Sequence, residues 1–419
     1  MWWTLLLLSA HGMTLADAVQ AGVARAPAMD AAEAGVAEAR AALGEVRGHL
    51  LPSASLNAAL IGQTEIEVDL FGQLTLPFPL PDSPDPLVIV PGTQVMGGAL
   101  VNAPLIAPAA WAGGRAAKEA VGLAESRVAA DAQSLTAGIV AAFHGAAQAR
   151  AVLAQAERVE ALAARLLDRG RTLQELGAIA EDEVLPFARA HATARANVAM
   201  AREGVGSAEG VLHQLTGLTG PAELAPVPTA VPDLEGLLAS VDRADLRAAS
   251  RGAETLGRRI QVAQAARYPT VGLQGAVNAV TPAPALGKEL TWRVSLGATV
   301  PLFQGGVSGQ VGQARAQVAR AEAASRMARE QAELQVRRSH GALSQAVAAL
   351  GLQDEALALA RATVTAAEAR LTEGGGSLFQ LQQAQLELVA AEGARTAAGI
   401  NASRASAELD LAARGTPER

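Results

Sequence analysis

Four stretches of the chain alternate apolar and polar residues with a period of two. The clearest begins at Ala54, where apolar side chains at even positions alternate with serine, asparagine and acidic residues at odd positions. Such alternation predicts strands with one apolar and one polar face. The predicted strands are 53–70, 95–104, 269–280 and 291–301, and the proline-rich segment 71–94 is predicted to be a loop.

A sheet with one apolar and one polar face suits two settings. In a membrane barrel the apolar face meets lipid and the polar face meets water. In a soluble antiparallel sheet the apolar face packs on a core instead. The strand pattern alone leaves both interpretations open.

The long stretches between the strands carry a seven-residue apolar repeat, which drives left-handed supercoiling of packed helices. From Gly306 to Leu371 there is no proline, and a helix of that length would extend about 100 Å. No compact domain needs such a rod, so we expect coiled-coil hairpins. The repeating positions are Val152, Val159, Leu166 and Leu173 in the first half of the chain and Val336, Leu343, Leu350, Leu357, Val364 and Leu371 in the second.

The same order of motifs occurs twice. Leu51-Pro52-Ser53 corresponds to Tyr268-Pro269-Thr270, and Pro104-Leu105-Ile106 corresponds to Pro301-Leu302-Phe303. Gly177 lies as many residues after Pro104-Leu105-Ile106 as Gly374 lies after Pro301-Leu302-Phe303. An internal repeat of this kind organises the whole fold.

A proline- and glycine-rich linker at 217–233 separates the repeats, which span 13–216 and 234–413, with a tail at 414–419. Helices are predicted at 17–48, 109–168, 184–216, 234–266, 306–371 and 378–412, and helix–helix turns at 169–183 and 372–377.

Residues 1–12 contain a short apolar run followed by small residues, which predicts a short signal peptide, although a basic start is missing. An ordinary buried start is the alternative. No other stretch of about 20 apolar residues predicts a membrane helix. Any membrane-spanning part is therefore expected to consist of strands.

Composition narrows the function classes. Half of the residues are hydrophobic but only 3% are aromatic, because much of the apolar content is alanine, a strong helix former. The net charge of −7 argues against nucleic acid as a partner. With no cysteine, disulfides, zinc–thiolate sites and thiol catalysis are excluded. The six histidines are scattered, and no phosphate-binding loop, nucleophile elbow or dinucleotide fingerprint appears. The sequence predicts no enzyme, cofactor or metal site.

The paired motifs around the strands, the turns at Gly177 and Gly374, and the segment 381–386 resemble the TolC family of outer-membrane efflux proteins over nearly the whole chain. The resemblance implies a mainly α-helical fold with two structural repeats and four membrane strands. Three copies would form a twelve-stranded barrel in the outer membrane and an α-helical tunnel in the periplasm. The implied function is a passive exit duct of a tripartite efflux pump or a type I secretion system.

The resemblance also implies partners. These are two further copies in a homotrimer, outer-membrane lipid, a periplasmic adaptor (membrane fusion) protein and an inner-membrane RND or ABC transporter. The two helix–helix turns would form the periplasmic tip, which is both the aperture and the docking surface for the adaptor. The candidate residues there are Gly177, Glu181, Asp182, Glu183, Arg370, Glu373, Gly374 and Gln380.

The tip residues also have purely structural interpretations. Glycine permits a tight reversal, and Ser377 with Gln380 resembles a capping box. Arg370 is either paired with Asp168 or Glu175 of the other hairpin or simply solvated.

The acidic tip residues allow two interpretations as well. Carboxylates in the first turn of a helix stabilise its dipole. Three copies of Glu181, Asp182, Glu183 and Glu373 around an axis would instead select cations. Some family members carry an aspartate pair after the second turn, where this chain has Gln380 and Gln383. Any acidic ring is therefore expected at the first turn.

Two other functions compete with the duct. A structural coiled-coil protein with a soluble sheet would transport nothing. A metal-ion efflux duct would use the same fold, but the chain has six methionines and no cluster rich in methionine or histidine.

Overall fold

The computed structural model describes residues 12–68, 87–227, 230–283, 288–373, 375 and 377–416. The expected signal peptide at 1–12 lies outside the described residues except for Gly12. The chain forms two compact units. The helical unit comprises Met1–Gly35, Ala124–Arg251 and Ala323–Arg419, and the sheet unit comprises Val36–Leu123 and Gly252–Glu322.

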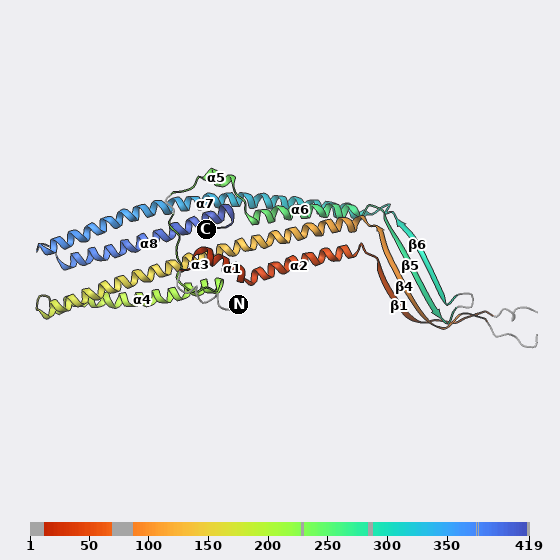
Figure 1. Ribbon diagram of the computed structural model, residues 1–419, viewed down its shortest axis with the longest axis horizontal. Coiled ribbons are helices and arrows are strands. Elements are labelled where there is room, and N and C mark those ends of the chain that lie inside the picture. The colour runs from red at the N-terminus through yellow and green to blue at the C-terminus, as the bar shows by residue number, and fades with distance from the viewer. Residues whose placement is uncertain are drawn as a thin grey trace, which may run out of the picture. The chain divides into compact units, whose positions relative to one another are not determined.

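Helices and strands follow one another in two similar series (Figure 1). The helices are α1 (Leu15–Arg25), α2 (Pro27–Gly48), α3 (Pro108–Glu175), α4 (Glu181–Thr216), α5 (Leu234–Ala239), α6 (Ala244–Ala265), α7 (Gly305–Thr372) and α8 (Leu378–Arg414). The strands are β1 (Ser53–Gly62), β2 (Ile66–Val68), β3 (Leu87–Val90), β4 (Thr93–Ile106), β5 (Thr270–Thr281) and β6 (Leu290–Thr299).

Four strands form an antiparallel sheet in the order β1-β4-β5-β6. Its register aligns Leu56, Ala99, Val277 and Trp292 in one row across all four strands. Because side chains alternate between faces along a strand, this row fixes which residues share a face.

The first predicted strand is shorter than expected. In place of one strand over 53–70, β1 ends at Gly62 and is followed by the short β2. β2 pairs with β3, and β3 lies inside the segment 71–94 that was predicted to be a loop. The two segments stay together because the Gln63 N–H donates to Gly92 O at 2.8 Å. Residues 69–86 lie outside the described residues. The proline-rich composition of 71–94 therefore did not exclude a short strand at its end, where β3 pairs with β2.

The single helix predicted at 17–48 is divided into α1 and α2. Thr14 and Asp17 form a capping box that starts α1. Ala26 ends it with extended backbone, ψ 123°, because the ring of Pro27 disfavours helical backbone in the residue before it. Pro27 then occupies the first position of α2, where its missing N–H costs nothing.

The first long helix continues past its predicted end at residue 168. It reaches Glu175, and α4 begins at Glu181, so the turn predicted at 169–183 is confined to five residues, 176–180. Gly170, which falls within the predicted turn, lies inside α3 against the ring of Phe187, where an added Cβ would come within 3.2 Å of Cδ2. Glycine is there for close packing between α3 and α4.

The helix predicted at 234–266 is also two helices. Asp233 caps α5 by accepting the Gly236 N–H at 2.8 Å. The chain leaves the helix at Ser240 and restarts at Ala244, where the Arg243 guanidinium donates to Asp245 and to Gln335 on α7. Local side-chain bonds of this kind compete with helical backbone bonds.

The remaining ends shift by one to a few residues. β4 was predicted at 95–104, β5 at 269–280 and β6 at 291–301, against the bounds given above. α7 and α8 were predicted at 306–371 and 378–412. α8 continues to Arg414, the first residue of the predicted tail 414–419, and Gly415 caps it with φ +77°.

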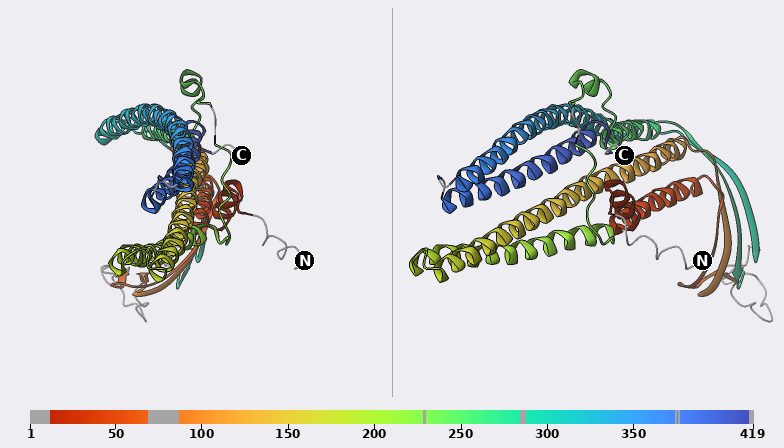
Figure 2. Two further views of the ribbon diagram at one scale, coloured as in Figure 1. Left: turned by 90° about the vertical axis from the view of Figure 1, so that its left-hand side faces the viewer. Right: turned by 60° about the vertical axis from the view of Figure 1, so that its left-hand side comes forward.

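In the helical unit, α7 and α8 run side by side, as do α3 and α4 (Figures 1 and 2). Val336, Leu343 and Leu357 of the seven-residue repeat are buried, which confirms the coiled-coil seam in the second repeat. Around the first two, α5, α7 and α8 form one apolar cluster. A second cluster joins α1, α3 and α4 around Ile139 and Phe143.

The first repeat packs on a different stripe from the one predicted. Leu162, Ala163 and Leu167 are buried, whereas Val152 remains 46% exposed and lines a surface groove with Val159. α3 therefore carries apolar residues on two stripes, of which Leu162, Ala163 and Leu167 form the buried one.

One stretch of α3 is long and apolar enough in composition to cross a membrane, contrary to the expectation from the sequence. A packed helix passes the same test. The centre of α3 packs against α1, α4 and α8 through Ile139, Val140 and Phe143, so its apolar content is used inside the helical unit.

Candidate functional site: the two-faced sheet and the helical tip

One face of the four-stranded sheet is apolar and exposed. Alternate residues on every strand point to this face, in the register described above. Leu56 is 88% exposed and Trp292 77% exposed, at opposite edges of the sheet. The other exposed members are Leu60, Val95, Val101, Leu273, Val277, Leu290, Val294 and Leu296. A single copy in water would leave this whole apolar surface wet.

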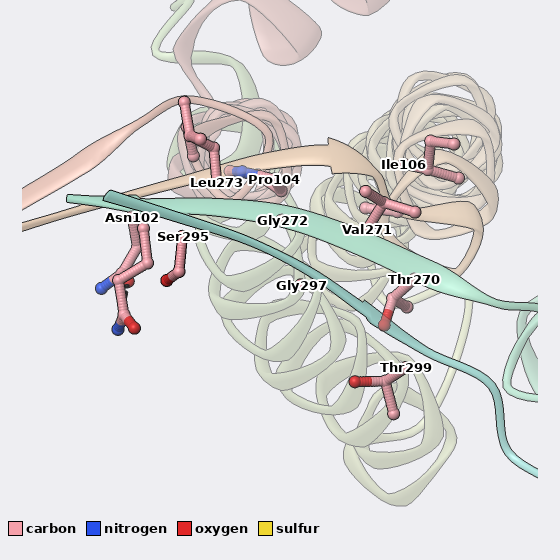
Figure 3. Close-up of a pocket in the computed structure, with 13 residues that line it drawn as sticks. Asn102, Pro104, Ile106, Thr270, Val271, Gly272, Leu273, Ser295, Gly297 and Thr299 are labelled. Carbon is pink, nitrogen blue, oxygen red and sulfur yellow. Dashed lines mark hydrogen bonds between the residues drawn. The ribbon is translucent and has the colours of Figure 1, made fainter. Parts of the chain in front are cut away.

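The opposite face carries amides and hydroxyls. Asn102, Ser295 and Thr299 lie on one side of the sheet in Figure 3, and Leu273 and Ile106 lie on the other. The side chain of Gln274 donates to Asn102 Oδ1 at 3.1 Å. The base of the sheet borders a cavity of about 530 Å³, which is lined by residues of both faces, Asn102 and Thr299 among them as well as Val271 and Leu273.

A glycine makes room for the amides. Gly98 is paired with Asn57 on one side and Asn278 on the other. An added Cβ at Gly98 would lie 2.6 Å from Asn278 Oδ1 and 3.1 Å from Asn57 Oδ1. Larger side chains would displace both amides, so glycine lets a polar row cross the sheet.

The strands have lengths and edges that suit a membrane wall. β1, β4, β5 and β6 contain 10, 14, 12 and 10 residues, and a tilted membrane strand needs about 9–11. The outer edges of β1 and β6 have no partner strand among the described residues. Unpaired edges in lipid are not tolerated, so such a sheet requires closure.

The first helix–helix turn ends in a glycine cap. Gly177 has φ +73°, and its N–H donates to Gln174 O at 2.9 Å. The Ala178 N–H donates to Leu173 O at 2.8 Å. This pair of bonds is a Schellman motif, which needs the left-handed backbone that glycine adopts without strain.

The acidic tip residues lie together in the first turn of α4. Glu181, Asp182 and Glu183 are exposed, and the N-cap Ala180 has no side chain to accept the free N–H groups. Their carboxylates therefore lie at the positive end of a helix dipole. Glu373, in the other turn, is exposed as well.

The second turn is capped by the predicted box. Ser377 Oγ accepts the Gln380 N–H at 3.2 Å, and Gln380 Oε1 accepts the Ser377 N–H at 3.4 Å, which confirms the capping interpretation. The Gly375 N–H donates to Arg370 O at 3.0 Å. Gly374 lies outside the described residues.

Arg370 is exposed, and within the described chain it makes no ion pair with Asp168 or Glu175. Hairpin contacts in the helical unit come from other ion pairs. Arg158 on α3 contacts Glu392 on α8 at 2.9 Å, in a pair that joins the two hairpins.

Sequence reasoning missed an apolar groove beside the tip. Phe187 and Pro186 of α4 and Phe379 of α8 line a cavity of about 530 Å³ together with residues of α3. Gln382 also lines it, and its Oε1 is buried without a hydrogen-bond partner among the described residues. The signal in the sequence was the placement of two of only six phenylalanines directly after the two turns.

Among the described residues, no group of three or more histidine, aspartate or glutamate side chains is placed to hold a metal ion.

The comparisons with known proteins agree with this architecture. The sequence model of one family, outer membrane efflux protein, matches residues 238–413, which is the second repeat. Comparison with curated proteins gives no match.

Solved outer-membrane proteins share the fold over nearly the whole chain. The outer membrane protein VceC of Vibrio cholerae is 18% identical with a TM-score of 0.73, covering 96% of each chain. The outer membrane channel CmeC of Campylobacter jejuni is 16% identical with a TM-score of 0.75, over 96% of this chain and 86% of CmeC. The MtrE channel of Neisseria gonorrhoeae, in its open state, is 19% identical with a TM-score of 0.73, over 96% and 89%.

The second repeat thus carries the family signature, and both repeats share the fold of these channels. Residues 238–413 of the chain match the outer membrane efflux protein family, and the chain as a whole has the TolC-type fold of these channels.

Proposed function

We propose that this chain is the outer-membrane channel of an efflux assembly, through which solutes leave the periplasmic side of the cell passively. The observation that carries the proposal is the two-faced sheet. Its apolar face is exposed from Leu56 to Trp292, and its opposite face bears Asn57, Asn102 and Ser295. Lipid on one side and water on the other satisfy both faces at once.

Closure of the sheet requires further copies of the chain. Four strands cannot surround a water-filled pore, and the free edges of β1 and β6 are available for pairing. In a homotrimer β6 of one copy would pair with β1 of the next, giving twelve strands and no edge. Three helical units would then prolong the pore as a tunnel.

The tip of the helical unit is the proposed aperture and docking surface. The groove beside Phe187 and Phe379 is apolar, and helices that bind in grooves use apolar anchors of this kind. A helical hairpin of a periplasmic adaptor is the proposed occupant, and the adaptor would connect the duct to an inner-membrane RND or ABC transporter. The chain itself supplies no chemistry in this account, only a passage.

A water-soluble coiled-coil protein is the alternative from a different class. It would have to cover the apolar face of the sheet with protein, and the described residues supply no layer over it. Contiguous exposed apolar surface of that extent is uncommon in monomeric soluble proteins.

The proposal is tested by purifying the chain from membranes in detergent and measuring its mass. We expect a complex of three 42.6 kDa chains that dissociates only on heating. Reconstitution in planar bilayers should give stepwise conductance. A protein that is recovered as a water-soluble monomer would refute both the trimer and the duct.

A further inference from the structure

The four-stranded sheet contains one charged side chain. β1, β4 and β5 have no lysine, arginine, aspartate or glutamate, and in β6 only Arg293 is charged. The whole chain is 18% charged, so this sheet is unusually poor in charge. A lone arginine in such a surface must have an environment that accepts it.

Register places Arg293 on the polar face. It is directly opposite Ala276 of β5, and it shares its side of β6 with Thr291 and Ser295. Trp292 and Val294, its neighbours along the strand, point to the apolar face. The guanidinium therefore lies on the side that the proposed function assigns to water.

No described residue neutralises the guanidinium. Arg293 is exposed, and among the described residues it has no ion-pair partner within 4 Å. Its nearest cross-strand neighbour is the small Ala276, which leaves the charge open to the lumen. On the lipid face the same arginine would destabilise the membrane-inserted sheet.

We propose that Arg293 gives the strand-lined part of the duct a preference for anions. The proposal rests on the proposed function, because it needs the polar face to line a pore. Three copies would place three guanidinium groups at one height in a wall with no opposing charge. Rings of arginine or lysine are a general means of favouring anions in pores. The solutes favoured would be small anions, such as chloride and organic carboxylates or phosphates.

The effect must depend strongly on salt. The screening length is about 30 Å at 0.01 M salt and about 3 Å at 1 M. Charges on the wall therefore influence ions throughout the lumen in dilute salt and only at the wall in concentrated salt. This dependence separates a wall charge from a change in pore width, which would affect conductance at every salt concentration.

The test compares wild type, Arg293→Gln and Arg293→Glu in planar bilayers under a tenfold KCl gradient at low and high mean salt. Ser295→Gln is the matched control, because it enlarges a neutral side chain on the same face of the same strand. We expect the anion-to-cation permeability ratio to fall by about twofold or more for Arg293→Gln in dilute salt, and further for Arg293→Glu. The control should keep the wild-type ratio, and the differences should vanish near 1 M salt.

The result that overturns the role of Arg293 is a conducting Arg293→Glu channel whose reversal potential equals that of wild type in dilute salt. A wild-type protein that forms no channel would instead refute the proposed function. The two failures are therefore distinguished by whether the wild type conducts.

Discussion

His144 Nε2 lies 3.3 Å from Ser403 Oγ, and this contact joins α3 to α8 across the interior of the helical unit. The other ring nitrogen lies 2.9 Å from Val140 O, in the preceding turn of α3. The imidazole is only 3% exposed. Burial lowers the pKa of His144, against a smaller raising effect of the Val140 carbonyl. On α8, Arg404 lowers that pKa further and Glu408 raises it.

The buried imidazole predicts a loss of stability in mild acid. Because its folded-state pKa lies below the ordinary value of 6.5, the unfolded chain binds the proton first as the pH falls. The stability that His144 contributes is therefore fully present above pH 6.5. It is lost as the pH falls from 6.5 through the lower folded-state pKa. His144→Gln, which keeps a polar group near Ser403, should flatten this part of the stability curve.

The measurement is the free energy of unfolding of wild type and His144→Gln at about pH 7.5 and pH 5. The variant should cost about 1 kcal/mol at the higher pH and less at the lower. Equal slopes for both proteins would show that His144 does not carry the dependence.

The Schellman motif at the first turn predicts a local cost for substitution of its glycine. Gly177→Ala forces a side chain into the left-handed region at φ +73° and should weaken the end of α3 by about 1 kcal/mol. Gly138→Ala is the control on the same helix, because nothing lies within 4 Å of its added Cβ, and it should be neutral or stabilising. Hydrogen exchange at the Ala178 amide should quicken for the first variant alone.

Much of the fold could be predicted because periodicity and repeats are long-range patterns. Alternation placed the strands that pair as β1, β4, β5 and β6, and the seven-residue spacing identified the buried Val336 and Leu343. Errors arose where a single residue has two possible roles. The turn predicted at 169–183 included Gly170, which lies inside α3 against the ring of Phe187.

The candidate tip was harder to predict. Spacing indicated the capping box of Ser377 and Gln380, since a cap is local in sequence. The groove beside Phe187 and Phe379 was missed because it depends on how three helices approach one another, and no local pattern encodes that.

The acidic cluster predicts ion selectivity at the aperture. Neutralising it as Glu181→Gln, Asp182→Asn and Glu183→Gln in one variant should shift the permeability ratio in bilayer recordings toward anions, because three copies of the exposed cluster would concentrate a negative field. Glu203→Gln, an exposed acidic residue on α4 beyond the first turn, is the control. Unchanged selectivity would assign the cluster to stabilisation of the helix dipole alone.

An arginine substituted on one face of β6 should impair assembly, and an arginine substituted on the other face should not. Leu296→Arg places a charge on the apolar face and should cost about 2–4 kcal/mol near the membrane midplane, reducing the amount of heat-modifiable trimer. Ser295→Arg, one residue away on the polar face, should assemble normally. Equal assembly of the two variants would argue that neither face meets lipid.

The most direct test of the two-faced sheet is cysteine labelling at Ser295 and Leu296 in the assembled protein. The chain has no cysteine of its own, so each introduced thiol is the only one. A water-soluble, membrane-impermeant thiol reagent should modify Ser295→Cys through the lumen and leave Leu296→Cys unmodified. In a second measurement, a quencher carried on lipid tails should quench a fluorescent probe at position 296 and not one at position 295. Rapid modification of Leu296→Cys by the water-soluble reagent, with no lipid quenching at that position, would contradict the assignment of lipid to one face and water to the other.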